Sequence, residues 1–431
     1  MTQARHARVR FATQDVLGRA PNIRVRLAIV AVALFVAACP PRAPTRTPLR
    51  VGANGDYPPF SAGHGAELSG LDIDVVHRFA RDTGRSVTIV PFRWPDLLAD
   101  LRAGRFDVAV GGVTIRPERA VVGTFTRPVV RAGAIVLAPP GLPALDAPDV
   151  RLAVNAGGHL ERLARRLFPA AALVTTTDNR LVDLLVAGDA DAIVTDEIEA
   201  DHLASERPAL GRRGPYTRDA KAYLAADPAL ARELDAWLRA REGDGTLAAL
   251  RARWLGAARA ARRSAADSDV DALAALIDLR FAFMPAVAAA KRAAGRPIDD
   301  PAQEARVLAA VEDWARPAGL APEPVATLFH ELIRAARAVQ ERFVRRPWPV
   351  DALDLDTEAR PALARVSHEI VQRLAAVTQE HVILDESAVA EQLDPSWSDA
   401  PTRAAIARAL VGMREQSACR EPTFVKAEQL R

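Results

Sequence analysis

The hydrophobic pattern of this 431-residue chain changes once, near residue 256, and that change decides what it folds into. Before it, short apolar runs alternate with amphipathic stretches, which is typical of α/β units built around a parallel sheet. After it the strand signals stop and apolar residues recur at helical spacing. We therefore predict a multidomain chain: an α/β part over 49–256, a polar Ala/Arg-rich linker over 257–267 and an all-helical part over 268–431.

The pattern also predicts where the elements lie. The expected strands are 49–53, 87–92, 106–112, 134–139, 150–155, 172–176 and 191–196. The expected helices of the first part are 71–83, 94–103, 160–167 and 179–187; those of the second are 270–292, 301–318, 322–343, 357–379 and 400–416. Because ligands of parallel sheets bind at the carboxyl ends of the strands, we expect a site at those ends.

Charge and cysteine content narrow the classes of function. The chain has 57 Lys and Arg against 54 Asp and Glu, a net charge of +3, with arginines spread along its length. Such a balance offers no basic surface for a polyanion, so we expect no nucleic-acid partner. Cys39 and Cys419 are 380 positions apart and neither has a neighbouring Cys or His. The sequence therefore predicts no metal site and no disulfide framework, and we expect no cofactor.

The N-terminus has the features of an export signal over 1–39. A run of 12 apolar residues, 27–38, follows Arg24 and Arg26. It is shorter than the roughly 20 residues that a membrane-spanning helix needs, but it fits the core of a signal peptide. The residues 36–39 resemble the lipobox of bacterial lipoproteins, in which Cys39 becomes lipidated, and cleavage after Ala38 fits as well. Either route predicts a protein exported to the periplasm, soluble or lipid-anchored, with a Pro-rich linker over 40–48.

The segment 106–119 predicts a carboxylate clamp. Its turn of small residues exposes backbone N–H groups, Thr114 adds a donor, and Arg119 can form a forked pair with a carboxylate. The segment resembles the signature of the family 3 extracellular solute-binding proteins, and the resemblance covers 49–256. It implies a two-lobed α/β fold of the periplasmic-binding-protein type that grips the carboxylate of its ligand with Thr114 and Arg119. The alternative is a surface arginine at a helix start.

Further short matches resemble cyclohexadienyl dehydratase more than a transport receptor; they lie at 55–57, 94–95, 154–158, 195–199 and 221–224. The substrate of that enzyme, prephenate, must lose its ring hydroxyl and a carboxylate together. This reaction requires a proton donor at the hydroxyl and cations at the carboxylates. The resemblance implies that Glu199 is the catalytic acid, kept protonated by a closed, apolar cleft. It implies substrate contacts for Asp56, Trp94, Asn155, Gly158, Asp196 and Lys221.

Interpretations in which these residues have no catalytic or binding role stay open. Glu199 and Lys221 are also typical of solvated helix and surface positions, and Trp94 of a core. The residues 155–158 are compatible with a plain turn as well as with an anion site at a helix N-terminus. Asp196 lies where transport homologues hold an ammonium group, which would suit arogenate as a substrate. His159 departs from the threonine of the dehydratases.

The second part contains basic and acidic residues whose spacing indicates a common site. Arg280 and Lys291 are 11 residues apart, which on a helix is about 16 Å and nearly one face. Asp300 is placed as a helix cap before Pro301, with Glu304 one turn later. This arrangement, with Gln340, resembles the AroQ chorismate mutases of the secreted subclass over about 268–415.

The resemblance implies the role of each of these residues. Lys291 and Gln340 would face the breaking ether oxygen of chorismate, and Arg280 would hold the side-chain carboxylate. Asp300 and Glu304 would hold the ring hydroxyl. The alternative is a solvated Arg/Lys face with an ordinary helix cap.

Three departures concern the predicted mutase. Gln303 stands where the family has arginine, and Ala336 stands where it has Ser or Thr. The later arginine that grips the ring carboxylate has three candidates, Arg360, Arg365 and Arg373, none in good register.

The two resemblances fit together, because the product of the mutase is the substrate of the dehydratase. We therefore predict a bifunctional exported enzyme that converts chorismate through prephenate to phenylpyruvate, and arogenate to phenylalanine if it accepts that substrate. The resemblance to secreted mutases implies a homodimer through the helical part. Two alternatives stay open: an amino-acid receptor fused to a helical module with weak or no mutase activity, and an active dehydratase beside a decayed mutase.

Overall fold

The computed structural model describes residues 47–418 except 143, 178, 207–208, 262 and 380–383. The predicted signal segment with Cys39, and also Cys419, lie outside the described residues. Within them, seven strands predicted from the sequence are present, and the strands Leu49–Ala53 and Ala172–Thr176 have the predicted bounds. No strand begins after residue 257 in the described part, as the sequence predicted.

The first lobe is built on a five-stranded sheet with the order β4-β1-β5-β14-β6. Its strands are β1 (Leu49–Ala53), β4 (Val87–Pro91), β5 (Val108–Ala109), β6 (Thr124–Phe125) and β14 (Leu224–Ala225). Its helices are α2 (Leu71–Asp82), α3 (Leu97–Arg102), α4 (Pro117–Ala120), α8 (Pro228–Gly243) and α9 (Thr246–Leu255). β1 pairs in parallel with β4 and β5, whereas β14 is antiparallel to β5 and β6.

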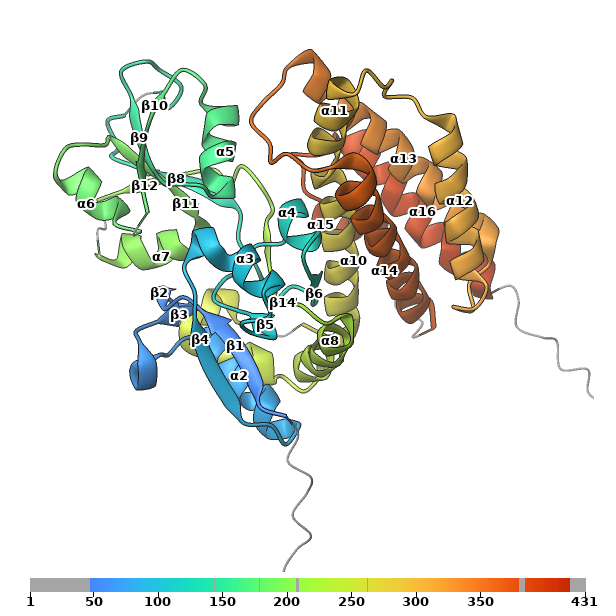
Figure 1. Ribbon diagram of the computed structural model, residues 1–431, viewed down its shortest axis with the longest axis horizontal. Helices are drawn as coiled ribbons and strands as arrows, with labels where there is room; N and C mark the ends of the chain where they lie inside the picture. Colours follow the sequence, from blue (N-terminus) through green and yellow to red (C-terminus); the bar gives the residue numbers. More distant parts are fainter. Residues whose placement is uncertain are drawn as a thin grey trace, which may run out of the picture. The chain divides into compact units, whose positions relative to one another are not determined.

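The second lobe has its own five-stranded sheet, with the order β10-β9-β11-β8-β12. Its strands are β8 (Ala134–Ala138), β9 (Arg151–Asn155), β10 (Ala172–Thr176), β11 (Ala192–Asp196) and β12 (Gly211–Arg213), and its helices are α5 (His159–Leu167), α6 (Leu181–Val186) and α7 (Glu197–Glu206). Figure 1 shows these strands with α5 and α6 in one lobe, and β1 and β4 with α2 in the other.

The two sheets are mixed rather than parallel, because the chain enters the second lobe and then returns. Short strands β7 (Val130–Arg131) and β13 (Ala220–Lys221) pair in antiparallel orientation where it crosses. The returning strand β14 then joins the first sheet beside β5. The outward and return passes both run beside the cleft between the lobes, which brings Lys221 next to Thr114.

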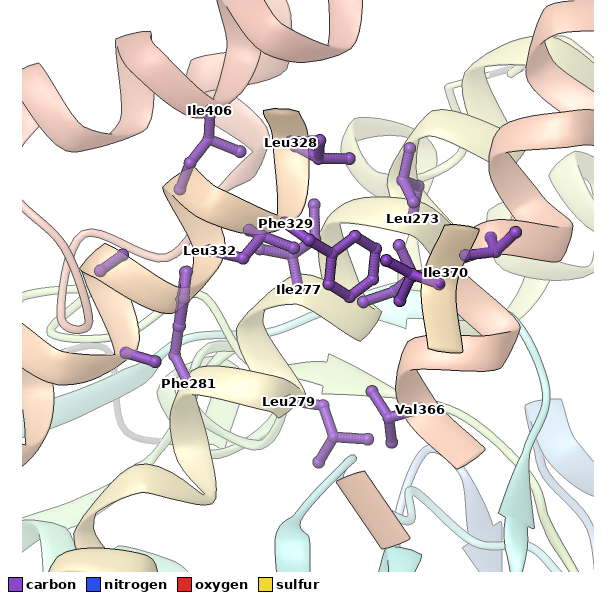
Figure 2. Close-up of a cluster of buried hydrophobic side chains, with 14 of the residues drawn as sticks. Leu273, Ile277, Leu279, Phe281, Leu328, Phe329, Leu332, Val366, Ile370 and Ile406 are labelled. Atoms are coloured by element: carbon purple, nitrogen blue, oxygen red, sulfur yellow. The ribbon is translucent and has the colours of Figure 1, made fainter. Parts of the chain in front are cut away.

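The second part is helical throughout its described residues. Its helices are α10 (Ala265–Ala282), α11 (Met284–Ala293), α12 (Pro301–Ala315), α13 (Pro322–Arg345), α14 (Arg360–Gln379), α15 (Glu386–Gln392) and α16 (Ala400–Ala418), with a π-helical turn at Leu355–Ala359. Their apolar faces meet around Phe329, which is fully buried. Figure 2 shows its ring beside Ile277 of α10 and Ile370 of α14. This cluster forms the hydrophobic core of the helical part.

The predicted helix 270–292 is in fact two helices that break at Phe283. Pro285 stands at the start of α11, where it lacks the N–H that a continuous helix would need. The first of the two begins with a capping box between Ser264 and Asp267. The stretch Ala265–Ala293 is long and apolar enough to span a membrane, but 78% of its most apolar window is buried inside the protein. It is therefore a core element of the helical part.

Buried ion pairs join the first lobe to the helical part. Arg127, which is 2% exposed, donates to Asp235 of α8 and to Asp269 of α10, each at 2.9 Å. Asp235 in turn pairs with Arg373 of α14 at 2.6 Å. Because an unpaired charge is costly in such a place, these four residues depend on one another for their burial.

Candidate active sites

The first candidate site is a cavity of about 330 Å³ between the two lobes. It is lined by side chains from both lobes and from the returning strand: Asp56, Tyr57, Trp94, Thr114, Arg119, Asn155, Gly158, His159, Asn179, Glu199 and Lys221. Eight residues predicted from the sequence line it: Asp56, Trp94, Thr114, Arg119, Asn155, Gly158, Glu199 and Lys221. The ninth, Asp196, lies behind the wall, 1% exposed.

Arg119 is a cation without a carboxylate partner within 4 Å among the described residues. Its Nη1 donates to the carbonyl of Thr114 at 2.7 Å, and its guanidinium lies 5.6 Å from the ring centre of Trp94. Burial lowers the pKa of Arg119 to about 10. An anionic ligand in this cavity would relieve the cost of leaving that charge unpaired.

Glu199 is the buried carboxyl group of this cavity, 4% exposed, at the start of α7. Its Oε1 accepts a hydrogen bond from Asn179 Nδ2 at 2.7 Å, and its Oε2 contacts the hydroxyl of Thr195. Burial, and next the charge of Asp196, raise the pKa of Glu199. A carboxyl group in this setting keeps its proton to a higher pH than an exposed glutamate does.

A buried ion pair supports the wall between these two groups. Lys221 Nζ lies 2.8 Å from Asp196 Oδ2, and 3.1 Å from the hydroxyl of Tyr57, which also contacts Asp196. Burial opposes ionisation of Asp196, but the ammonium of Lys221 holds its pKa below the usual value. Since Lys221 already neutralises this carboxylate, a contact of Asp196 with a ligand ammonium stays a prediction.

The glycine turn before Thr114 differs from the expectation. The N–H groups of Gly111 and Gly112 are not directed at a ligand, because both donate to Asp72 Oδ2, at 2.9 and 2.8 Å. Glycine is nevertheless required at 112. Its φ is +73°, and a Cβ there would lie 2.6 Å from the ring of Tyr57. The turn therefore brings Tyr57 close and fixes Thr114, rather than forming an anion nest.

His159 is the first residue of α5 and lies beside Asp219. Its Nε2 lies 3.6 Å from Asp219, and burial lowers its pKa to about 3. The substitution for threonine that the sequence revealed therefore adds a neutral ring, not a cation, at the start of α5.

The second candidate site is a cavity of about 250 Å³ within the helical part. All five residues predicted for it line this cavity: Arg280, Lys291, Asp300, Glu304 and Gln340. Gln303 and Ala336, which depart from the family pattern, line it too. The break between α10 and α11 does not separate Arg280 from Lys291, because both still face this cavity.

Arg280 is the most buried cation of the second cavity, 6% exposed. Its Nη1 donates to Ser367 Oγ at 2.9 Å, and within 4 Å it has no carboxylate partner among the described residues. Burial lowers its pKa to about 10. Burial also lowers the pKa of Lys291, whose Nζ donates to the carbonyl of Ile298 at 2.6 Å. The two cations are thus placed to meet an anionic ligand.

The acids of this cavity are already partnered. Asp300 caps α12 by accepting from the N–H of Gln303 at 3.0 Å, and its other oxygen lies 3.1 Å from Arg360. Glu304 pairs with Arg337 at 2.8 Å. Gln340, by contrast, has a buried Oε1 without a partner. Its amide is the polar group of the wall that a ligand would complete.

The structure separates the three arginines that the sequence left undecided. Arg360 lines the cavity. Arg365 instead donates to the carbonyl of Ala120 at 3.0 Å, and Arg373 pairs with Asp235 at 2.6 Å. Arg360 is therefore the candidate of the three that a bound carboxylate would meet.

Sequence reasoning missed several residues of these sites. Asn179 and Tyr57 line the first cavity, and Arg337 and Ser367 line the second. The available signal for Asn179 was its position in the short connection after the predicted strand 172–176, where ligands of α/β folds gather. Within the described residues, no group of three or more His, Cys, Asp or Glu side chains is arranged to hold a metal ion.

Comparisons with known proteins divide the chain at the same place as its fold. Residues 49–257 match the model of the bacterial extracellular solute-binding proteins, family 3, and residues 262–341 match that of chorismate mutase type II. The cyclohexadienyl dehydratase of Pseudomonas aeruginosa is 35% identical over 220 residues, which cover 48% of this chain and 82% of that protein.

Several other matches of the same region are binding proteins. A probable amino-acid ABC transporter-binding protein of Haemophilus influenzae is 26% identical, covering 48% of this chain and 84% of that protein. A solved structure of an ancestral amino acid-binding protein, described as a precursor of cyclohexadienyl dehydratase, is 32% identical with a TM-score of 0.45, covering 48% of this chain and 95% of that one.

Proposed function

The chain belongs to the family 3 extracellular solute-binding proteins, with a chorismate mutase type II domain fused behind, and on that basis we propose a bifunctional enzyme. Its helical part rearranges chorismate to prephenate, and its two-lobed part converts prephenate to phenylpyruvate. The observation that most supports this is the cavity in which an unpaired arginine, Arg119, shares the lining with a buried acid, Glu199.

In the proposed dehydratase step, Glu199 donates its proton to the ring hydroxyl of prephenate. The C–O bond breaks and water leaves, while the ring carboxylate leaves as carbon dioxide and its electron pair makes the ring aromatic. The proton comes back to Glu199 from solvent. Arg119 and Thr114 hold a carboxylate of the substrate, and the raised pKa of Glu199 keeps the proton available.

In the proposed mutase step no proton moves. One C–O bond of chorismate breaks as one C–C bond forms, so the protein only selects the reactive conformation and stabilises charge on the ether oxygen. Lys291 and the amide of Gln340 face that oxygen. Arg280 of α10 and Arg360 of α14, which both line the cavity, hold the two carboxylates, and Asp300 with Glu304 accepts from the ring hydroxyl.

The proposal extends to export and assembly. The segment 1–39 directs export. The chain is cleaved after Ala38, Cys39 carries a lipid if the lipobox is used, and the mature protein forms a homodimer through its helical part. Membrane fractionation of the parent and the Cys39→Ala variant distinguishes the two routes. Light scattering of the purified protein gives the oligomeric state, and a monomer would contradict the dimer.

The test of the enzyme gives the purified protein chorismate alone and follows prephenate and phenylpyruvate in one chromatographic assay. We expect phenylpyruvate to accumulate after a transient of prephenate. Accumulation of prephenate alone would contradict the dehydratase step. Conversion of added prephenate without conversion of chorismate would contradict the mutase step. Failure of both, with calorimetric binding of an amino acid, would identify a receptor. Arogenate in place of prephenate tests the second substrate.

A further inference from the structure

We propose that Asn179 is a positioning residue for Glu199 and that it couples the placement of this acid to closure of the two lobes. The inference rests on the proposed function, because it concerns the group that is to donate the proton. It comes from the contacts of one amide that lies between the second lobe and the first.

The amide of Asn179 is held by three partners. Its Nδ2 donates to Glu199 Oε1 at 2.7 Å and to the backbone carbonyl of Asp56 at 3.3 Å. Its Oδ1 accepts from Asn155 Nδ2 at 2.5 Å. A backbone carbonyl never donates, so the two acceptors on one side and the donor on the other fix which way the amide points. Both hydrogens of Nδ2 are thereby used.

These partners come from both sides of the cavity. Asn155 ends β9 and Glu199 lies in the first turn of α7, both in the second lobe, whereas Asp56 follows β1 in the first lobe. The contact with Asp56 exists only while the lobes are together. Closure therefore completes the same set of hydrogen bonds that orients Glu199.

The backbone at this position is held in an unusual conformation. Asn179 has a φ of +59°, and no other non-glycine residue has a positive φ in the described part of the chain. Asparagine is among the few residues that tolerate this region, and it does so at a cost in backbone strain. The conformation points the amide at Glu199, so the strain coincides with the contact proposed to matter.

Both oxygens of Glu199 accept hydrogen bonds in this arrangement. Oε1 accepts from Asn179 and Oε2 from the hydroxyl of Thr195, so the two contacts together hold the carboxyl group in place. At the other end of the chain of amides, Asn155 Oδ1 is buried without a partner. It is an acceptor that a hydroxyl of the substrate would complete.

The experiment compares three variants with the parent, using mutase activity on the same chain as the control for folding. Glycine adopts this backbone conformation without strain, so Asn179→Gly removes only the side-chain amide. Asn179→Ala removes the amide and adds strain. Asn179→Asp keeps the shape but turns an oxygen toward two acceptors. We expect the glycine variant to lose about 10–10²-fold in kcat for prephenate, the aspartate variant to lose more, and mutase activity to stay unchanged.

The pH profile separates positioning from a merely structural role. An acid that works when protonated loses activity as pH rises through its pKa. Asn179 stabilises the ionised form of Glu199, so its removal moves the alkaline limb of the dehydratase profile to higher pH. A glycine variant with the rate and limb of the parent would overturn the inference. So would loss of activity in the alanine variant only, because that would be an effect of backbone strain.

A direct titration keeps this result distinct from failure of the proposed function. The ¹³C carboxyl signal of Glu199, assigned by its loss in Glu199→Gln, is titrated in the parent and in Asn179→Gly. We expect a higher pKa in the glycine variant. If the parent lacks dehydratase activity, the proposed function is wrong, yet this titration still decides whether Asn179 controls Glu199. An unchanged pKa would overturn the inference.

Discussion

Lys221 and Asp196 form a buried ion pair, with 2.8 Å between Nζ and Oδ2, beneath the wall of the inter-lobe cavity. The pair joins the strand that returns to the first lobe with the end of β11 in the second. This pair neutralises the charge of Lys221. Arg119 is therefore the cation of this cavity that has no described carboxylate within 4 Å. The division of labour between these two cations leads to the first prediction.

Replacing Arg119 by Met should reduce kcat/KM for prephenate by about 10–10²-fold, the value of one charged hydrogen bond to a carboxylate. The chromatographic assay with added prephenate measures this. The matched control is Arg93→Met, an arginine whose side chain is 85% exposed beside Asp96, and it should leave the rate within twofold of the parent. Equal losses in both variants would show that Arg119 has no special role.

Replacing Glu199 by Gln should lower kcat of the dehydratase by about 10²–10⁴-fold, because an amide has no acidic proton to give. KM should change little, since Arg119 and Thr114 remain. Conversion of chorismate to prephenate by the same variant should equal that of the parent. A variant that still makes phenylpyruvate at the parent rate would remove Glu199 from the mechanism.

Replacing Arg360 by Gln should lower kcat/KM of the mutase by about 10–10²-fold, because Arg360 lines its cavity and would meet a substrate carboxylate. Arg365→Gln is the comparison, since that side chain contacts the carbonyls of Ala120 and Val121 instead. Its mutase rate should stay near that of the parent when both are measured by loss of chorismate. The reverse ranking would reassign the carboxylate contact.

Breaking the buried cluster around Arg127 should be costly. Arg127→Met leaves Asp235 and Asp269 short of one partner each, and we expect a loss of about 3–5 kcal/mol in the free energy of unfolding. Arg316→Met removes an ion pair whose side chains are 59% and 74% exposed, and its effect should stay within about 0.5 kcal/mol. Urea unfolding followed by circular dichroism measures both. Similar small values would mean that the cluster contributes no net stability.

Asp278 should make the protein less stable as pH rises. Burial raises its pKa to about 7, whereas the unfolded chain has an Asp pKa of about 3.9. Between these values the folded state holds a proton that the unfolded state has lost, so this group favours folding at low pH and loses that contribution as pH rises to 7. Asp278→Asn should flatten this part of the curve of unfolding free energy against pH. A curve parallel to that of the parent would contradict the assignment.

Local pattern was enough to predict most elements, because each is defined by residues close in sequence. The strand Ala172–Thr176 is a bounded apolar run, and the cap of α12 needs only Asp300 and Pro301. The expected strand 106–112 was too long, since the sheet pairing stops at Ala109 and the two glycines turn with positive φ. The expected helix 270–292 failed at Pro285, whose effect depends on its exact place in the helix.

The candidate sites divide in the same way. Arg280 and Lys291 were predicted to share one face of a single helix. Both line the second cavity, although the helix breaks between them at Phe283. Asn179 was not predictable, because its partners Asn155, Glu199 and Asp56 come from three separate segments that only the folded lobes bring together. The cluster of Arg127 is of the same kind. With arginine abundant along the whole chain, nothing local distinguishes the one that is buried.

The buried cluster around Arg127 also affects whether the two parts of the chain can be separated at the linker between them. The linker 257–267 is the obvious place to divide the chain. The partners of Arg127, however, lie on either side of it, in α8 and α10. Cleavage of the backbone there would leave these ion pairs intact. Expressing either part alone would leave buried charged side chains without their partners. Either part produced on its own would therefore need substitutions at these buried charged positions.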